Sequence, residues 1–156
     1  MDSLIIEQKL ASVARCVRRI QSRYEGGKGD NGDESGGSTW TENVDTQDIV
    51  ALNLARAIGL CVDIALHMAA SWVDAEPSSM AASFEPLVAK RVIDRKTADE
   101  LRLAVGFRNV VVHNYEAIDW DRVAPGIDAR LDLFRLFAAQ VIRYVDRQTE
   151  SGSGGR

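Results

Sequence analysis

Cysteine and histidine are scarce in this sequence, with two of each among 156 residues. The cysteines, Cys16 and Cys61, lie in separate helix-like segments. They lack the close pairing of a metal knuckle and the density of a disulfide scaffold, so we expect buried free thiols. Two histidines without a cysteine cluster also argue against a structural zinc site. We expect neither a metal nor a cofactor.

Long apolar runs are missing as well. No stretch approaches the ~18 uninterrupted apolar residues that a membrane span needs, and the N-terminus has no apolar signal segment. Hydrophobic residues make up 46% of the chain and charged residues 27%, which is the balance of one soluble globular domain. The sequence therefore predicts a cytoplasmic protein with no membrane partner.

An excess of positive charge is also lacking. The net charge of −4 argues against a broad electrostatic surface for nucleic acid, and we expect no DNA partner. The charge is unevenly spread, however: residues 1–24 are mainly basic and residues 25–45 mainly acidic. The arginines of the first segment fall on more than one helix face, which favours a solvated surface over a phosphate track. A local basic groove for RNA remains compatible with this charge.

Apolar residues recur at steps of three and four through most of the chain, which is the spacing of amphipathic helices. No alternating run bounded by hairpin signals occurs, so the sequence predicts an all-α fold, a four- to five-helix up-and-down bundle. The expected helices cover residues 2–24, 46–74, 84–93, from 97 into the segment 107–115, and part of 119–148.

Helix ends and loops follow from local signals. Asp45 or Thr46 is the expected N-cap of the second helix, and Thr97 with Glu100 fits a capping box for the fourth. The start of the last helix is left open by Pro125 and Gly126. We expect one domain over residues 1–148, with a flexible, acidic, glycine-rich insert at 25–45 and a disordered tail at 149–156.

The stretch FRNVVVHNY, residues 107–115, sets polar side chains into an apolar run. Residues five apart on a helix are separated by about 140°, so Arg108 and His113 point to different sides, whereas Asn109 and His113 share a face. Arg108 lies near the line of Tyr115 if the helix extends that far. A purely structural interpretation pairs Arg108 with a carboxylate, gives His113 a helix-end hydrogen bond and packs the ring of Tyr115.

The longer stretch GFRNVVVHNYEAIDWDRV resembles the signature of the HEPN-domain toxins of the HepT type. That motif is an arginine, a polar residue, three further residues, a histidine, one residue and a tyrosine. Here the positions are Arg108, Asn109, His113 and Tyr115. The likeness extends upstream to TQDIVALNLARAIGLCVDIALHMA and covers nearly the whole chain in element order, apart from the acidic insert.

This resemblance implies a metal-independent endoribonuclease that acts as a homodimer on RNA, whether mRNA or tRNA. RNA cleavage through the 2′-OH needs a group that takes or gives a proton near neutral pH, and an unperturbed imidazole titrates near ~6.5. As a histidine, His113 is of the residue type that this chemistry needs. The planar guanidinium of Arg108 suits the charge of a phosphorane-like transition state. If a twofold axis runs beside them, Arg108 of one protomer completes a site with His113 of the other.

The resemblance also implies a control on Tyr115. In the family, a cognate nucleotidyltransferase antitoxin, MntA, attaches AMP to the corresponding tyrosine, which places phosphate charge beside the cleft. Asp63 is a weaker candidate: it either pairs with His67, four residues on, or orients Arg108 as a supporting residue. The rival interpretation is a non-catalytic helical module that binds and regulates a nucleotidyltransferase through the Arg–His edge.

Overall fold

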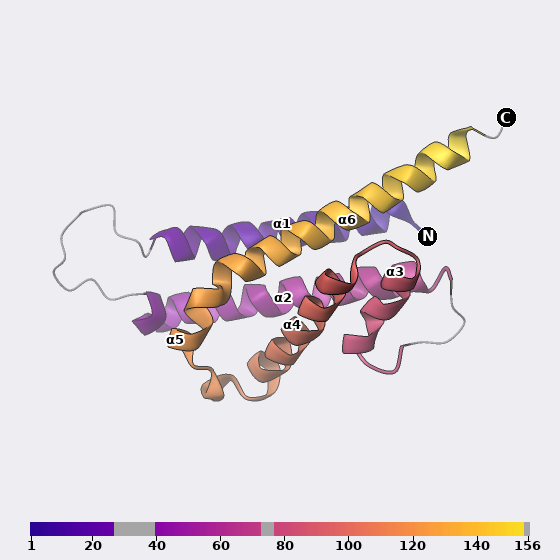
Figure 1. The fold of residues 1–156 in the computed structure, drawn as a ribbon. Helices are drawn as coiled ribbons and strands as arrows, with labels where there is room; N and C mark the ends of the chain where they lie inside the picture. Colours follow the sequence, from indigo (N-terminus) through magenta and orange to yellow (C-terminus); the bar gives the residue numbers. More distant parts are fainter. Residues whose placement is uncertain (27–39, 73–76, 155–156) are drawn as a thin grey trace.

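The computed structural model describes residues 1–26, 40–72 and 77–154, and every regular element within these ranges is helical. Four long helices run alternately up and down, and short helical segments connect them (Figure 1). The predicted all-α bundle is confirmed. The long helices are α1 (Ser3–Gly26), α2 (Val44–Ala69), α4 (Arg95–His113) and α6 (Ile127–Ser153), and the short ones are α3 (Glu85–Ala89) and α5 (Trp120–Val123). Four 3₁₀ turns complete these ranges: η1 (Trp40–Glu42), η2 (Ala81–Phe84), η3 (Tyr115–Ala117) and η4 (Ala124–Gly126).

Helix α2 forms the centre of the bundle and packs against α1, α4 and α6. It is apolar on most of its surface, and among the described helices it alone has the length and composition that could cross a membrane. In this protein, however, 56% of that apolar window is buried. A helix that is apolar nearly all round must be covered, and in α2 the neighbouring helices cover it. The composition of α2 is therefore that of a core helix.

Aromatic packing holds the segment between α2 and α4 against α6. Phe84 of η2 and Phe137 of α6 are fully buried, and their rings meet edge to face with centroids 6.2 Å apart. Such a pair contributes about 0.5–1.5 kcal/mol beyond the burial of its area. Since η2 directly follows Met80 in the chain, this packing also fixes where Met80 sits.

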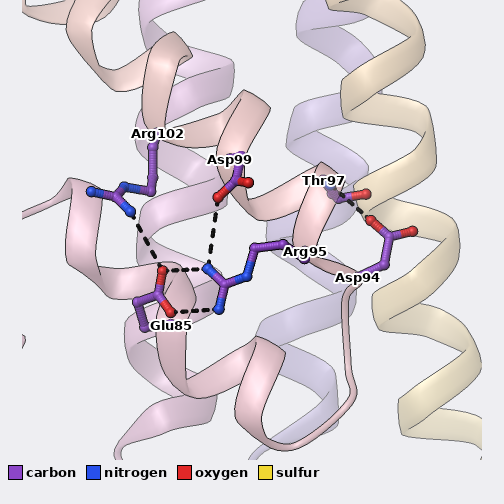
Figure 2. A network of polar contacts seen from close by, with 6 residues as sticks. All are labelled: Glu85, Asp94, Arg95, Thr97, Asp99 and Arg102. Carbon is purple, nitrogen blue, oxygen red and sulfur yellow. Dashed lines mark hydrogen bonds and ion pairs between the residues drawn. The ribbon is translucent and has the colours of Figure 1, made fainter.

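Exposed ion pairs orient α3 against the first turns of α4 (Figure 2). The guanidinium of Arg95 donates two hydrogen bonds, of 2.8 and 3.0 Å, to the carboxylate of Glu85. Oδ1 of Asp99 lies 3.6 Å from Nη1 of Arg95, and Nη1 of Arg102 lies 3.6 Å from Oε1 of Glu85. The hydrogen bonds from Arg95 lower the pKa of Glu85. Because these side chains are about half exposed, water screens each pair and its contribution to stability is small, so the network mainly sets orientation.

The N-caps lie earlier than the sequence analysis placed them. Asn43 caps α2 by accepting a hydrogen bond from the backbone N–H of Thr46 at 3.1 Å, so the prediction of Asp45 or Thr46 was wrong. Asp94 caps α4 by accepting from the backbone N–H of Thr97 at 2.7 Å. The expected capping box of Thr97 with Glu100 was also wrong, because Thr97 already lies in the first turn and is buried.

Several predicted helix ends need correction. The segment 84–93 forms only the short helix α3, and its chain turns at Arg91, which has a positive φ of 56°. The last helix begins at Ile127, after a 3₁₀ turn that takes up Pro125 and Gly126. It continues to Ser153, so most of the tail expected to be disordered from residue 149 is helical.

Two further predictions concern the insert and the thiols. The acidic insert 25–45 falls mainly on residues 27–39, which lie outside the described residues; its end already forms η1 and the start of α2. Cys16 and Cys61 are buried free thiols, as predicted. Burial raises the pKa of both thiols, which keeps them protonated and chemically inert near neutral pH.

Candidate active site

The last turns of α4 carry the predicted motif at one end of the bundle, beside the start of α6 (Figure 1). Phe107 and Val111 face inward and pack against the core, which anchors this part of the helix. Asn109 and His113 are exposed and Arg108 is half-buried. The helix therefore presents a polar edge next to an apolar anchor, as the spacing predicted.

The guanidinium of Arg108 is not committed to an ion pair. Its Nη1 lies 3.5 Å from the sulfur of Met80, a weak acceptor. No carboxylate within residues 1–26, 40–72 and 77–154 pairs with it. Met80 supports the side chain from one side and leaves its other N–H groups available for an anion. The structural interpretation, in which a carboxylate neutralises Arg108, does not hold for the described chain.

Asp63 forms no ion pair with Arg108 in the described part of the chain. Its carboxylate lies 3.6 Å from Nζ of Lys9 on α1, so it joins α2 to α1. His67 accepts a hydrogen bond of 3.2 Å at Nε2 from the backbone N–H of Asp2. The proposed supporting role of Asp63 was wrong, because this residue lies on the side of α2 that faces α1.

His113 is the last residue of α4. The next residue, Asn114, leaves the helical conformation with φ −150° and ψ 53°, and its N–H donates to the carbonyl of Val110 at 2.8 Å. The backbone thus satisfies the carbonyl of Val110 without the imidazole. The ring of His113 is exposed and makes no hydrogen bond to the part of the chain that the structure describes. The imidazole is therefore accessible from solvent.

Tyr115 lies on η3 and not on α4. Its hydroxyl donates a hydrogen bond to Oδ1 of Asp48, in the first turns of α2. Its ring lies against Trp120, with centroids 6.4 Å apart and planes tilted by 59°. Burial, and then the Asp48 carboxylate, raise the pKa of Tyr115 to about 12. The phenol is therefore neutral, half-buried and held at a fixed position.

A cavity of about 230 Å³ opens beside the motif, among α2, α4, α5 and α6. Phe107, the residue before Arg108, forms part of its wall, and two guanidinium groups reach it. Arg122 is exposed and pairs with Asp119 at 3.5 Å. Arg130 is half-buried, and burial lowers its pKa. Neither arginine stands out in the sequence, because each is a single basic residue in its own segment and the two segments meet only in the folded chain.

The outer face of α4 is apolar and uncovered. Leu103 is 73% exposed and Val110 37%. With Gly106, also exposed, they follow one face at steps of three and four. Apart from its chain neighbours and the backbone of α4 itself, a Cβ added at Gly106 would meet no atom of the described residues within 4 Å, so packing within this part of the chain does not require glycine there. The strip of Leu103, Gly106 and Val110, which we call the α4 strip, runs beside Arg108 and His113.

In the residues that the structure describes, Arg108 has no carboxylate partner and the ring of His113 has no hydrogen bond. An up-and-down helical bundle with such an arginine and histidine at the end of one helix has the features of a HEPN-type ribonuclease. Residues 13–141 match the family model described as ribonuclease HepT-like. The match covers most of the chain, so the protein belongs to the HepT-like ribonuclease family and is by class an endoribonuclease.

Known relatives agree with this assignment. The chain is 35% identical to the mRNA nuclease HepT of Shewanella oneidensis over 137 residues, which covers 88% of this chain and 95% of the relative. The tri-AMPylated Shewanella oneidensis HEPN toxin, solved in complex with an MNT antitoxin, superposes with a TM-score of 0.77 and 31% identity, covering 92% of this chain and 99% of that one. A toxin–antitoxin structure with AMP-PNP gives a TM-score of 0.76, 31% identity and coverage of 90% and 99%.

Proposed function

We propose that this chain is the toxin of a two-component toxin–antitoxin pair. It is a metal-independent endoribonuclease of the cytoplasm, and an MntA-like nucleotidyltransferase silences it by attaching AMP to Tyr115. The observation that carries the proposal is the pairing of an unneutralised guanidinium, Arg108, with a solvent-exposed imidazole, His113, at the end of one helix. The named activity and partners of the Shewanella proteins support it.

The chemistry requires two functions that these side chains supply. The 2′-oxygen of RNA attacks the adjacent phosphorus, and the bond from phosphorus to the 5′-oxygen breaks. His113 takes the proton of the 2′-OH or returns one to the leaving 5′-oxygen. Arg108 donates hydrogen bonds to the phosphoryl oxygens as negative charge develops on them. Asn109 shares the exposed face of His113 and offers further hydrogen bonds to the RNA.

A second copy of the chain completes the site. Arg108 and His113 point to different sides of α4, so two α4 helices that meet along the α4 strip bring Arg108 of one protomer toward His113 of the other. The exposed Leu103 and Val110 supply the apolar contact, and Gly106 allows close approach of the two backbones. Arg122 and Arg130, which line the cavity beside the motif, add positive charge for the flanking RNA backbone.

RNA cleavage in the presence of EDTA tests the nuclease. The wild type should cut single-stranded RNA and leave a 2′,3′-cyclic phosphate, and a 2′-deoxy substitution at the cut position should block the reaction. His113→Ala and Arg108→Ala should each lose ~10²-fold or more. Arg143→Ala, an exposed arginine on α6, is the matched control and should retain full activity.

Growth arrest on expression separates the nuclease from the rival, a helical module that only binds and regulates a nucleotidyltransferase. Expression of the wild type alone should stop growth, whereas His113→Ala should not. If both are harmless and neither cuts RNA, the binding module is the better explanation.

A further inference from the structure

The contact between Tyr115 and Asp48 joins the atom that would receive AMP to a carboxylate of the same chain. The hydroxyl of Tyr115 donates to Oδ1 of Asp48 across 67 positions of sequence. Asp48 is exposed and Tyr115 is half-buried, so this hydrogen bond lies at the protein surface, where a nucleotide can approach the hydroxyl oxygen of Tyr115. Nothing in the nuclease chemistry of Arg108 and His113 uses this carboxylate.

Both partners of the contact stand on fixed elements. Asp48 lies in the first turns of α2, directly after the cap that Asn43 provides. The ring of Tyr115 is held between the core and Trp120. Because both residues stand on ordered elements and are already within hydrogen-bond distance, the phenol hydrogen is directed at the carboxylate before any partner arrives.

A neutral phenol is a poor nucleophile until it loses its proton. With the pKa of Tyr115 at about 12, the ionised fraction near pH 7 is on the order of 1 in 10⁵. Attack on phosphorus therefore needs an acceptor that takes the proton as the new bond forms. Protein kinases meet the same need with an aspartate that accepts the proton of the substrate hydroxyl.

We propose that Asp48 is the proton acceptor for attachment of AMP to Tyr115, so that the toxin supplies its own catalytic base for its inactivation. The inference rests on the proposed function, since it assumes a nucleotidyltransferase that presents ATP. A bond forms between the oxygen of Tyr115 and the α-phosphorus of ATP, the bond from that phosphorus to the β-phosphate oxygen breaks, and pyrophosphate leaves. The phenolic proton passes to Asp48 and then to water.

The test measures AMP incorporation into the full chain by intact mass, with ATP, Mg²⁺ and the MNT antitoxin of Shewanella oneidensis as the transferase. Asp48→Asn keeps an accepting oxygen near the hydroxyl but cannot take its proton. It should lower the maximal rate of the first AMP addition ~10²-fold or more while the KM for ATP stays unchanged, because ATP is bound by the transferase. Asp48→Glu should restore part of the rate.

Asp45→Asn is the matched control, because Asp45 is an exposed carboxylate one turn earlier on α2. It should react at the wild-type rate, and thermal unfolding should verify that all variants are folded. If the wild type gains AMP and Asp48→Asn gains it at the same rate or faster, this inference alone is overturned. A faster rate would mean that Asp48 restrains the phenol instead of accepting its proton. A wild-type chain that gains no AMP would overturn the proposed control of Tyr115 and this inference with it.

Discussion

His113 ends helix α4 and Tyr115 begins the 3₁₀ turn η3, and Asn114 turns the chain between them. The two residues are two positions apart but belong to different elements and have different partners. His113 is exposed and free to meet a substrate, whereas Tyr115 is held against Asp48 and Trp120. This separation is consistent with the proposed division of roles, in which His113 transfers protons on RNA and Tyr115 receives AMP.

The raised pKa of Tyr115 predicts how stability changes at high pH. A group whose pKa is higher in the folded state contributes stability below its unfolded pKa, near ~10, and loses it as the pH rises. For Tyr115 that loss should extend from about pH 10 toward about 12. We expect the melting temperature of the wild type to fall more steeply than that of Tyr115→Phe above pH 10. Parallel curves would contradict the shift.

Tyr115→Phe should distinguish whether the hydroxyl of Tyr115 receives AMP or binds the scissile phosphate. The substitution keeps the ring packing against Trp120 and removes only the hydroxyl. We expect the variant to fold, to retain most of its ribonuclease activity and to gain no AMP, so that it stays toxic beside an active antitoxin. If the hydroxyl instead bound the scissile phosphate, activity would fall ~10²-fold. Full neutralisation of a toxic Tyr115→Phe chain would point to tight binding as the control.

Composite sites predict complementation between inactive chains. In a heterodimer of Arg108→Ala and His113→Ala, one of the two sites would hold both wild-type side chains. We expect each variant alone to be inactive and the verified heterodimer to recover up to about half of the wild-type activity. The measurement is RNA cleavage by co-purified chains that carry different tags. Inactive heterodimers would exclude a site shared between protomers.

If two chains meet along the α4 strip, Gly106 should be the position where dimerisation is most sensitive to a side chain. Because a Cβ placed there would come within 4 Å of no other part of the described chain, apart from its chain neighbours and the backbone of its own helix, Gly106→Leu should fold as a monomer. A leucine would separate two helices that meet along the α4 strip, and the variant should lose both dimer mass in light scattering and nuclease activity. Gly59→Ala, on α2 and equally without a close neighbour, should leave the dimer intact. A dimeric, active Gly106→Leu chain would place the interface elsewhere.

Periodicity predicted the four long helices because each has to bury one stripe, and burial repeats along the sequence. Ile6, Leu10, Val13 and Val17 on α1 are buried at the expected spacing. The motif residues were also predictable, since an arginine and a histidine within an apolar run stand out without any knowledge of the fold. Periodicity does not give the position of the last helical residue, so the sequence left open whether the helix extends to Tyr115.

Contacts between distant segments left no signal in the sequence. Asp48 was not singled out, because its partner lies 67 residues away and a single aspartate near a helix start is unremarkable. Asp63 was chosen instead for its spacing to His67, but its neighbour across the helix interface is Lys9. The N-caps Asn43 and Asp94 were missed because suitable cap residues stand nearby in both segments, and the choice among them depends on where the chain enters the bundle.

Asp94 gives a direct test of the cap that the structure assigns to α4. Its carboxylate accepts from the backbone N–H of Thr97 at 2.7 Å and from the side chain of Gln140 at 2.9 Å. The first of these bonds is the largest cause of a lowered pKa for Asp94. Asp94→Ala should therefore destabilise the protein by about 1 kcal/mol, within the ~0.5–2 kcal/mol range for cap removal.

Asp94→Asn, which keeps an accepting oxygen for Thr97, should lose less than the alanine variant in urea unfolding. Because the folded pKa is depressed, the advantage of aspartate over alanine should be full above the unfolded pKa of ~3.9 and should shrink as the pH falls below it. Glu100→Ala tests the alternative capping box and should leave the α4 cap intact. A larger loss from Glu100→Ala than from Asp94→Ala, or a loss at Asp94 that does not change between pH 7 and 3, would show that the carboxylate of Asp94 is not the cap.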